Sequence, residues 1–162
     1  MVRVRKWHIG RWALIAVVLH AACVGPGSSV LVRDDDREMN EAMARARAEV
    51  QDFVHRLLSP LPGDTDFDIK VRITEAGNTE HFWVDSVAFK DGKFEGRLAN
   101  DPEFVRGHRL GEAVSVAAEQ ISDWMYVHEG RLVGGYTIRV MRDRLSPAER
   151  LRFDQGLPFK IE

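Results

Sequence analysis

The first regular pattern in the chain is a stripe of apolar residues between Arg37 and Ser59. Its members recur at alternating steps of four and three: Met39, Met43, Ala46, Val50, Phe53 and Leu57. This spacing predicts an amphipathic α-helix with one apolar face, which Pro60 and Pro62 end. A coiled-coil seam has the same spacing, but about three heptads are too few to favour it, so we expect the apolar face to dock on a sheet.

The period changes to two after a turn at residues 62–65. Apolar and polar residues alternate from Phe67 to Thr74, which predicts a half-buried strand. Further strands are expected over residues 80–89, 93–99, 113–118, 122–128 and around 136–141. The pairs Asp91-Gly92 and Glu129-Gly130 predict tight turns between neighbouring strands.

Two short helical segments are expected in the second half of the chain. Residues 102–107 follow strong turn residues and are expected to form one helical turn. Ser146 is a typical N-cap, with Pro147 at the first helical position and Glu149 at the third, so a short helix should end near residue 155. The predicted fold class is α+β, with an antiparallel sheet of about six strands, a long N-terminal amphipathic helix and a short C-terminal helix.

The chain opens on a basic stretch followed by an apolar one. Four basic residues precede the apolar run over residues 12–19: Arg3, Arg5, Lys6 and Arg11. This order is typical of a secretory signal peptide. The run has eight residues, whereas a membrane-spanning helix needs about 20. We therefore expect export to the periplasm rather than a permanent transmembrane helix.

Cys23 is the only cysteine in the chain and closely follows this run. The segment Leu19-His-Ala-Ala-Cys23 resembles the lipobox of bacterial lipoproteins, a family in which the cysteine becomes the acylated first residue of the mature chain. Ala21 and Ala22 fit the pattern, and His20 stands where the family usually has an aliphatic residue. The resemblance implies lipidation at Cys23 and attachment to the membrane through the lipid. The alternative is ordinary signal cleavage nearby, which leaves a soluble periplasmic protein.

These features divide the chain into three parts. Residues 1–23 are the predicted signal peptide, residues 24–36 a flexible tether and residues 37–162 the domain. The tether begins with Gly, Pro and Ser and ends in Asp34, Asp35 and Asp36, where negative charge favours the start of a helix.

The charge of the mature chain differs from that of the precursor. The 162 residues hold 23 basic and 25 acidic side chains, a net charge of −2. The predicted signal peptide holds four of the basic residues and none of the acidic ones, which leaves 19 against 25, a net charge of −6. The length fits one domain. An acidic domain argues against nucleic acid as a partner.

Four strings, in this order, carry a family resemblance: Glu80-His-Phe-Trp-Val84, Asp91-Gly-Lys-Phe-Glu-Gly-Arg-Leu-Ala-Asn-Asp-Pro102, Ile121-Ser-Asp-Trp-Met-Tyr126 and Gly134-Gly-Tyr-Thr-Ile-Arg139. They closely resemble the bacterial DUF2314 family, the group that includes YegJ-like proteins. The resemblance covers roughly residues 39–159. The activity of that family is unknown, so the resemblance implies a single compact domain, often behind a lipoprotein or secretory signal, and assigns no role to individual residues.

Three residues are candidates for acid–base chemistry: Glu80, His81 and Asp123. Neighbouring residues on a strand point to opposite faces, so Glu80 and His81 are not expected to share one substrate or ion. The four histidines of the mature chain show no metal-ligand spacing, and no nucleophile elbow or phosphate loop is present, so we expect no metal and no cofactor.

Aromatic and charged residues supply a candidate binding surface. Its members are Trp83, Trp124, Tyr126 and Arg139. On a strand over residues 122–128, Trp124 and Tyr126 share one face, which lies either in the core or at an exposed binding patch. If Asp123 and Arg139 lie on neighbouring strands, they are positioned for a structural ion pair.

The favoured interpretation is a non-enzymatic binding or structural module of the cell envelope. It is tethered by lipid at Cys23 and presents its sheet to an envelope protein or peptide. The alternative is a small envelope hydrolase that uses Glu80, His81 or Asp123 as acid and base. Neutralisation of a toxin is a third possibility, supported only by a small acidic domain.

Overall fold

The structure is a computed structural model that describes residues 36–162. The predicted signal peptide, Cys23 and the tether up to residue 35 lie outside the described residues. The predicted α+β class is confirmed. The elements are α1 (Arg37–Ala48), α2 (Val50–Leu58), β1 (Asp64–Glu75), β2 (Asn78–Lys90), β3 (Lys93–Leu98), β4 (Ala113–Ala117), the 3₁₀ turn η1 (Ala118–Gln120), β5 (Ile121–His128), β6 (Arg131–Gly134), α3 (Tyr136–Asp143) and α4 (Pro147–Gly156).

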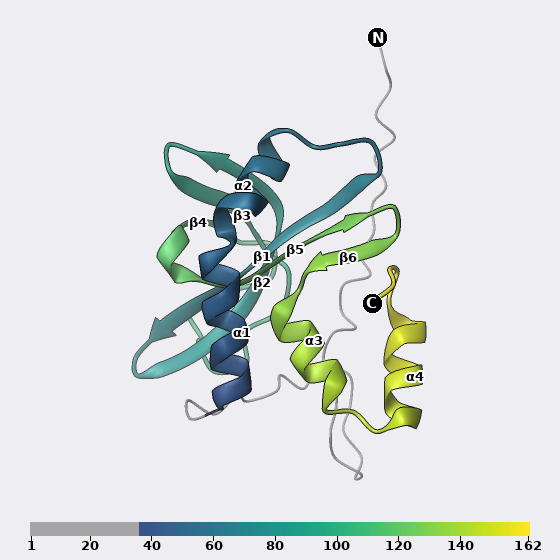
Figure 1. The fold of residues 1–162 in the computed structure, drawn as a ribbon. Helices are drawn as coiled ribbons and strands as arrows, with labels where there is room; N and C mark the ends of the chain where they lie inside the picture. Colours follow the sequence, from purple (N-terminus) through teal and green to yellow (C-terminus); the bar gives the residue numbers. More distant parts are fainter. Residues whose placement is uncertain (1–35) are drawn as a thin grey trace. The chain divides into compact units, whose positions relative to one another are not determined.

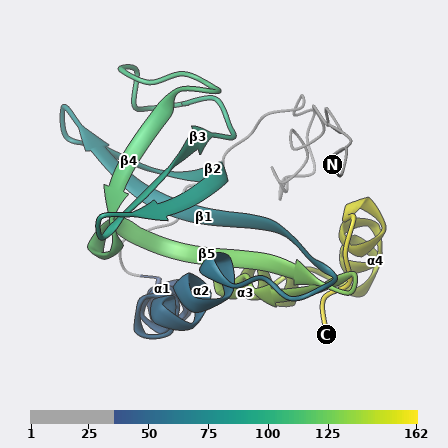
Figure 2. The same ribbon diagram turned by 90° about the horizontal axis from the view of Figure 1, so that it is seen from above.

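The six strands form one antiparallel sheet in the order β4-β3-β2-β1-β5-β6. Three hairpins close with two successive residues at positive φ, as Asp91 and Gly92 do between β2 and β3. This conformation gives the connection a twist that matches the strands. Figure 2 shows α1, α2 and α3 on the same side of β5.

The predicted N-terminal helix is present but is interrupted at Glu49, which separates α1 from α2. Asp36 caps α1, because its side chain accepts from the backbone N–H of Met39 at 3.1 Å. The predicted apolar stripe docks on the sheet rather than forming a coiled-coil seam. The fully buried Phe53 packs with its ring centroid 5.3 Å from that of Trp124 on β5 and 6.1 Å from that of Phe94 on β3.

The predicted strand around residues 136–141 is wrong, because this segment is helix α3 (Figure 1). The sixth strand is β6, which pairs with β5 immediately after the predicted turn at Glu129-Gly130. Gly134 and Gly135 then take φ values of +71° and +61°, and a Cβ at Gly134 would overlap the backbone carbonyl of Trp124. The glycine pair therefore turns the chain out of the sheet and into a helix.

The helical turn predicted over residues 102–107 is also absent. The backbone N–H groups of Glu103, Phe104 and Val105 all donate to the carboxylate of Glu80, at 3.0 to 3.2 Å. A distant side chain thus satisfies the donors that a helix would leave unpaired in its first turn. The C-terminal helix predicted from Ser146 is confirmed as α4, whose capping box joins Ser146 and Glu149.

Candidate functional site

Trp124 and Tyr126 belong to the core. Their exposed fractions are 3% and 8%, and the indole Nε1 of Trp124 donates to the carbonyl of Ala46 on α1 at 2.8 Å. Their rings stack with centroids 6.4 Å apart. Of the two positions that the sequence left open, the structure therefore selects the core, and these residues form no exposed patch.

Trp83 and Arg139, the other two members of the predicted binding surface, do not form a common surface with Trp124 and Tyr126. Trp83 is half-buried on β2, where the Nζ of Lys70 lies 5.4 Å from its ring centroid. Arg139 lies on α3, and its guanidinium donates to three backbone oxygen atoms, those of Leu132, Gly134 and Glu162, at 2.6 to 3.0 Å. Because these bonds hold Arg139, the expected Asp123–Arg139 ion pair is absent.

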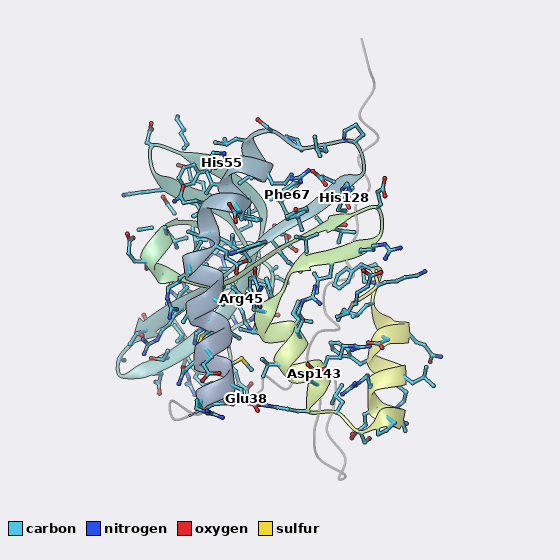
Figure 3. All side chains as sticks on the ribbon, in the orientation of Figure 1. Glu38, Arg45, His55, Phe67, His128 and Asp143 are labelled. Carbon is cyan, nitrogen blue, oxygen red and sulfur yellow. The ribbon has the colours of Figure 1, made fainter. Side chains whose placement is uncertain are left out.

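Arg139 lines a hollow of about 370 Å³ between β6 and the start of α3. Arg45 reaches it from α1, and Figure 3 shows this side chain between α1 and α3. The guanidinium of Arg45 lies 5.1 Å from the ring centroid of Tyr136 and pairs with Glu49 at 2.8 Å. Both arginines of this hollow are therefore engaged in intramolecular contacts.

The three candidate acid–base residues occupy separate environments. The carboxylate of Glu80 is buried and accepts the three N–H groups of the 103–105 loop. His81 is half-buried, and its Nδ1 lies 2.8 Å from the Oγ of Ser122. Asp123 is fully buried and caps α3. The structure does not bring them together, which removes the acid–base constellation that a hydrolase would need.

Asp123 shows how a strand residue can start a helix. Its Oδ1 accepts from the N–H groups of Trp124 and Tyr136, and its Oδ2 accepts from the N–H and the hydroxyl of Thr137, all at 2.6 to 3.1 Å. Burial raises the pKa of this carboxyl, while Thr137, Lys70 and the backbone donors oppose that shift. Asp123 is therefore a tertiary N-cap for α3.

The hydrogen bond between Ser122 and His81 holds the imidazole ring in place. The hydroxyl of Ser122 also lies 3.2 Å from the carbonyl of Lys70, which can only accept. When both bonds are made, the serine proton goes to that carbonyl, and Oγ accepts from the Nδ1–H of His81. A serine nucleophile would instead donate its proton to the histidine, so this geometry holds the ring and does not activate the serine.

His81 opens into a second hollow, a groove of about 790 Å³. Five elements supply its lining: Asn40, Met43 and Arg47 from α1, Arg72 and Thr74 from β1, His81 from β2, Glu119 and Gln120 from η1, and Ile121 and Ser122 from β5. The helix residues follow the spacing i, i+3, i+7 and so share one face. Residues two apart on β1 likewise share a face. We name this site the polar groove.

The charge of the polar groove is opposite in sign to that of the domain. Two arginines and one glutamate line it, which leaves one positive charge with His81 neutral. Within residues 36–162, neither Arg47 nor Arg72 forms an ion pair. Arg47 makes one long hydrogen bond, 3.4 Å to the carbonyl of Ile121. Sequence reasoning missed both arginines, because only the strand register places Arg72 opposite His81.

Among the described residues, no three His, Cys, Asp or Glu side chains are placed to hold a metal ion. The helices of residues 36–162 are likewise too short or too polar to cross a membrane.

Asp68 on β1 is an unusual titratable group outside the groove. It is 8% exposed, and burial together with the nearby Asp85 and Asp66 carboxylates raises its pKa to about 7. The folded state therefore favours the protonated form, and stability is lost as the pH rises from about 4 through 7.

We expect Asp68→Asn to increase the free energy of unfolding at pH 8 by about 2 to 4 kcal/mol, with little change at pH 4, because the amide carries no charge to bury. Urea unfolding at the two pH values measures this effect. Asp101→Asn, on an exposed loop, is the matched control and should change neither value. Equal effects of Asp68→Asn at both pH values would contradict the assignment.

Comparisons with known proteins give curated relatives and a matching family model. The chain is 38% identical over 104 residues to "Uncharacterized protein YegJ" of Escherichia coli (strain K12), a match that covers 64% of this chain and 67% of that protein. It is 34% identical over 142 residues to "Putative ankyrin repeat protein NMB1133/NMB1171" of Neisseria meningitidis serogroup B (strain ATCC BAA-335 / MC58). That match covers 79% of this chain and 54% of the relative. No solved structure gives a significant match.

The family model described as "Uncharacterized protein conserved in bacteria (DUF2314)" matches residues 36–159. This range holds nearly all of the described domain, including every residue that lines the polar groove. The chain belongs to the DUF2314 family.

Proposed function

We propose that this domain is a non-catalytic ligand-binding module of the bacterial cell envelope and that its ligand site is the polar groove. The single observation that carries the proposal is this hollow of about 790 Å³, whose two arginines form no ion pair within the described residues. Its volume lies within the range of small-molecule sites, and its mostly polar lining suits a polar or charged ligand.

Binding is favoured over catalysis by the fate of the candidate acid–base residues. Glu80 and Asp123 each hold backbone N–H groups of a distant segment, and Ser122 orients His81. A hydrolase would need such groups to converge on one reacting atom. The partner we propose is an envelope protein, peptide or smaller component that inserts into the groove, rather than one that contacts Trp124 or Tyr126.

The proposed envelope location rests on the basic and apolar N-terminal stretch and on Cys23. Expression of the full chain in a bacterium, followed by intact-mass measurement of the membrane fraction, tests it. The expected mass is that of residues 23–162 with attached acyl chains, and Cys23→Ser should release the protein from that fraction. An unprocessed chain in the cytoplasm would overturn the location.

Binding is tested by following the amide signals of the full, ¹⁵N-labelled chain during addition of a peptide and small-molecule extract of bacterial envelopes. We expect shifts in residues that line the groove, with no extract component consumed. Thr74→Trp should prevent the shifts, because a large side chain fills the groove without changing its charge. Ser115→Trp, at an exposed position on β4, is the matched control and should not.

Three results would overturn the binding proposal. One is that no groove signal moves on addition of the extract. Another is that Thr74→Trp and Ser115→Trp respond like the unmodified chain. Catalytic consumption of an extract component that depends on His81 would instead favour the hydrolase.

A further inference from the structure

We infer that the polar groove recognises an oxyanion, a carboxylate or phosphate group of its ligand. This inference rests on the proposed binding function and specifies the chemistry of the ligand. Its basis is that positively charged and neutral donors line both walls of the groove in an otherwise acidic domain.

The sheet wall brings two nitrogen-rich side chains together. Arg72 on β1 and His81 on β2 are directly opposite each other in the antiparallel register. Residues in such pairs have their Cβ atoms about 5 Å apart. The guanidinium of Arg72 has hydrogen-bond donors and no acceptor, and a protonated His81 would carry a second positive charge. An ion pair between these two side chains therefore cannot form. An oxyanion beside them would accept from Arg72 and, when the imidazole is protonated, also from the Nε2–H of His81, because Ser122 accepts the Nδ1–H.

The helix wall supplies the third donor. Arg47 and Asn40 lie on the face of α1 that lines the groove, two turns apart, with Met43 between them. The one hydrogen bond of Arg47 among the described residues is long, so most of its guanidinium donors are not used by carboxylates or carbonyls of this domain. A guanidinium donates to a carboxylate or phosphate with two parallel bonds, which makes Arg the usual side chain for such groups.

The remaining groove residues are consistent with this chemistry. Ser122 holds His81 by its Nδ1, which fixes the plane of the ring. Glu119 is the one acidic residue in the lining and reduces the net positive charge without cancelling it. By contrast, Arg45 beside the smaller hollow is neutralised by Glu49. Arg139, the other arginine of that hollow, already donates to three backbone oxygen atoms.

The experiment titrates the full, ¹⁵N-labelled chain with three small probes at constant ionic strength: acetate, inorganic phosphate and acetamide. Acetamide has nearly the shape of acetate but no charge. We expect at least one of the two anions to shift the amide signals around Arg47, Arg72 and His81, with Kd of about 1 to 10 mM for such small probes. Acetamide should leave these signals unchanged.

Two groove variants and one matched control decide the outcome. Arg47→Gln and Arg72→Gln should each weaken anion binding about tenfold or more, because each removes a charge-assisted bond. Arg106→Gln makes the same change at an exposed loop position outside the groove and should leave Kd unchanged. The amide spectrum of each variant also reports that the domain is folded.

The outcomes separate this inference from the binding proposal. Stronger binding of phosphate than acetate indicates a phosphate-bearing ligand, and the reverse order indicates a carboxylate. Equal shifts with acetamide, or unchanged Kd in both groove variants, would overturn oxyanion recognition. If the envelope extract moves the groove signals but neither anion does, the groove binds a ligand of other chemistry. If neither moves them, both proposals fail.

Discussion

Replacement of Asp123 by alanine is expected to lower the free energy of unfolding by about 3 to 5 kcal/mol, because it leaves four buried or half-buried donors without their acceptor. These donors belong to Trp124, Tyr136 and Thr137. The loss should be concentrated at the start of α3, whose first N–H groups have no acceptor within their own helix. Urea unfolding measures the total effect, and hydrogen exchange at Tyr136 and Thr137 locates it.

Asp123→Asn separates the charge from the geometry. Its oxygen can still accept from two donors, but its NH₂ group faces other donors, so an intermediate loss of about 2 kcal/mol is expected. Asp143→Ala, at the exposed C-terminal end of α3, is the matched control and should cost less than about 1 kcal/mol. If Asp123→Ala costs no more than Asp143→Ala, Asp123 does not hold α3 in place.

Trp124→Ala should be comparably destabilising, with a loss of about 3 to 5 kcal/mol, because it opens a cavity in the core. The indole contacts Phe53 and Tyr136, whose ring centroids lie 5.3 and 5.5 Å away, and it satisfies the carbonyl of Ala46. Trp124→Phe keeps part of the packing and loses the hydrogen bond, so its loss should be smaller. Thermal and urea unfolding measure both variants.

Trp83→Ala is the control for Trp124→Ala, because Trp83 is half-buried on β2. We expect it to cost about 1 to 2 kcal/mol, in proportion to the smaller area removed from water. A similar loss at both positions would contradict the core assignment of Trp124. Trp124→Ala is also unsuitable as a test of binding, because reduced binding would follow from unfolding alone. The exposed Arg47 and Arg72 serve that purpose.

Local patterns predicted most of the fold correctly. The four-and-three spacing of apolar residues between Arg37 and Ser59 is typical of an amphipathic helix, and the alternation of apolar and polar residues in β1 is typical of a half-buried strand. The Asp91-Gly92 turn and the capping box of α4 depend on residues only a few positions apart. Such elements are encoded locally, so their positions follow from the sequence.

The errors have a different physical origin. Residues 136–141 alternate like a strand, but Asp123 on β5 satisfies the first N–H groups of a helix there. Residues 103–105 form a loop because Glu80, more than twenty residues earlier in the chain, accepts hydrogen bonds from their backbone N–H groups. In both segments a distant carboxylate supplies the deciding hydrogen bonds, and the local pattern contains no trace of it.

The sequence by itself determined most of the helical and strand segments, the family and the acidic character of the domain. Only the tertiary structure decided that Trp124 and Tyr126 are core residues, since either face of a strand can be the buried one. It also decided that Arg47, Arg72 and His81 share one groove. The physical reason is that strand register and helix docking, which no local pattern specifies, bring together side chains from α1, β1 and β2.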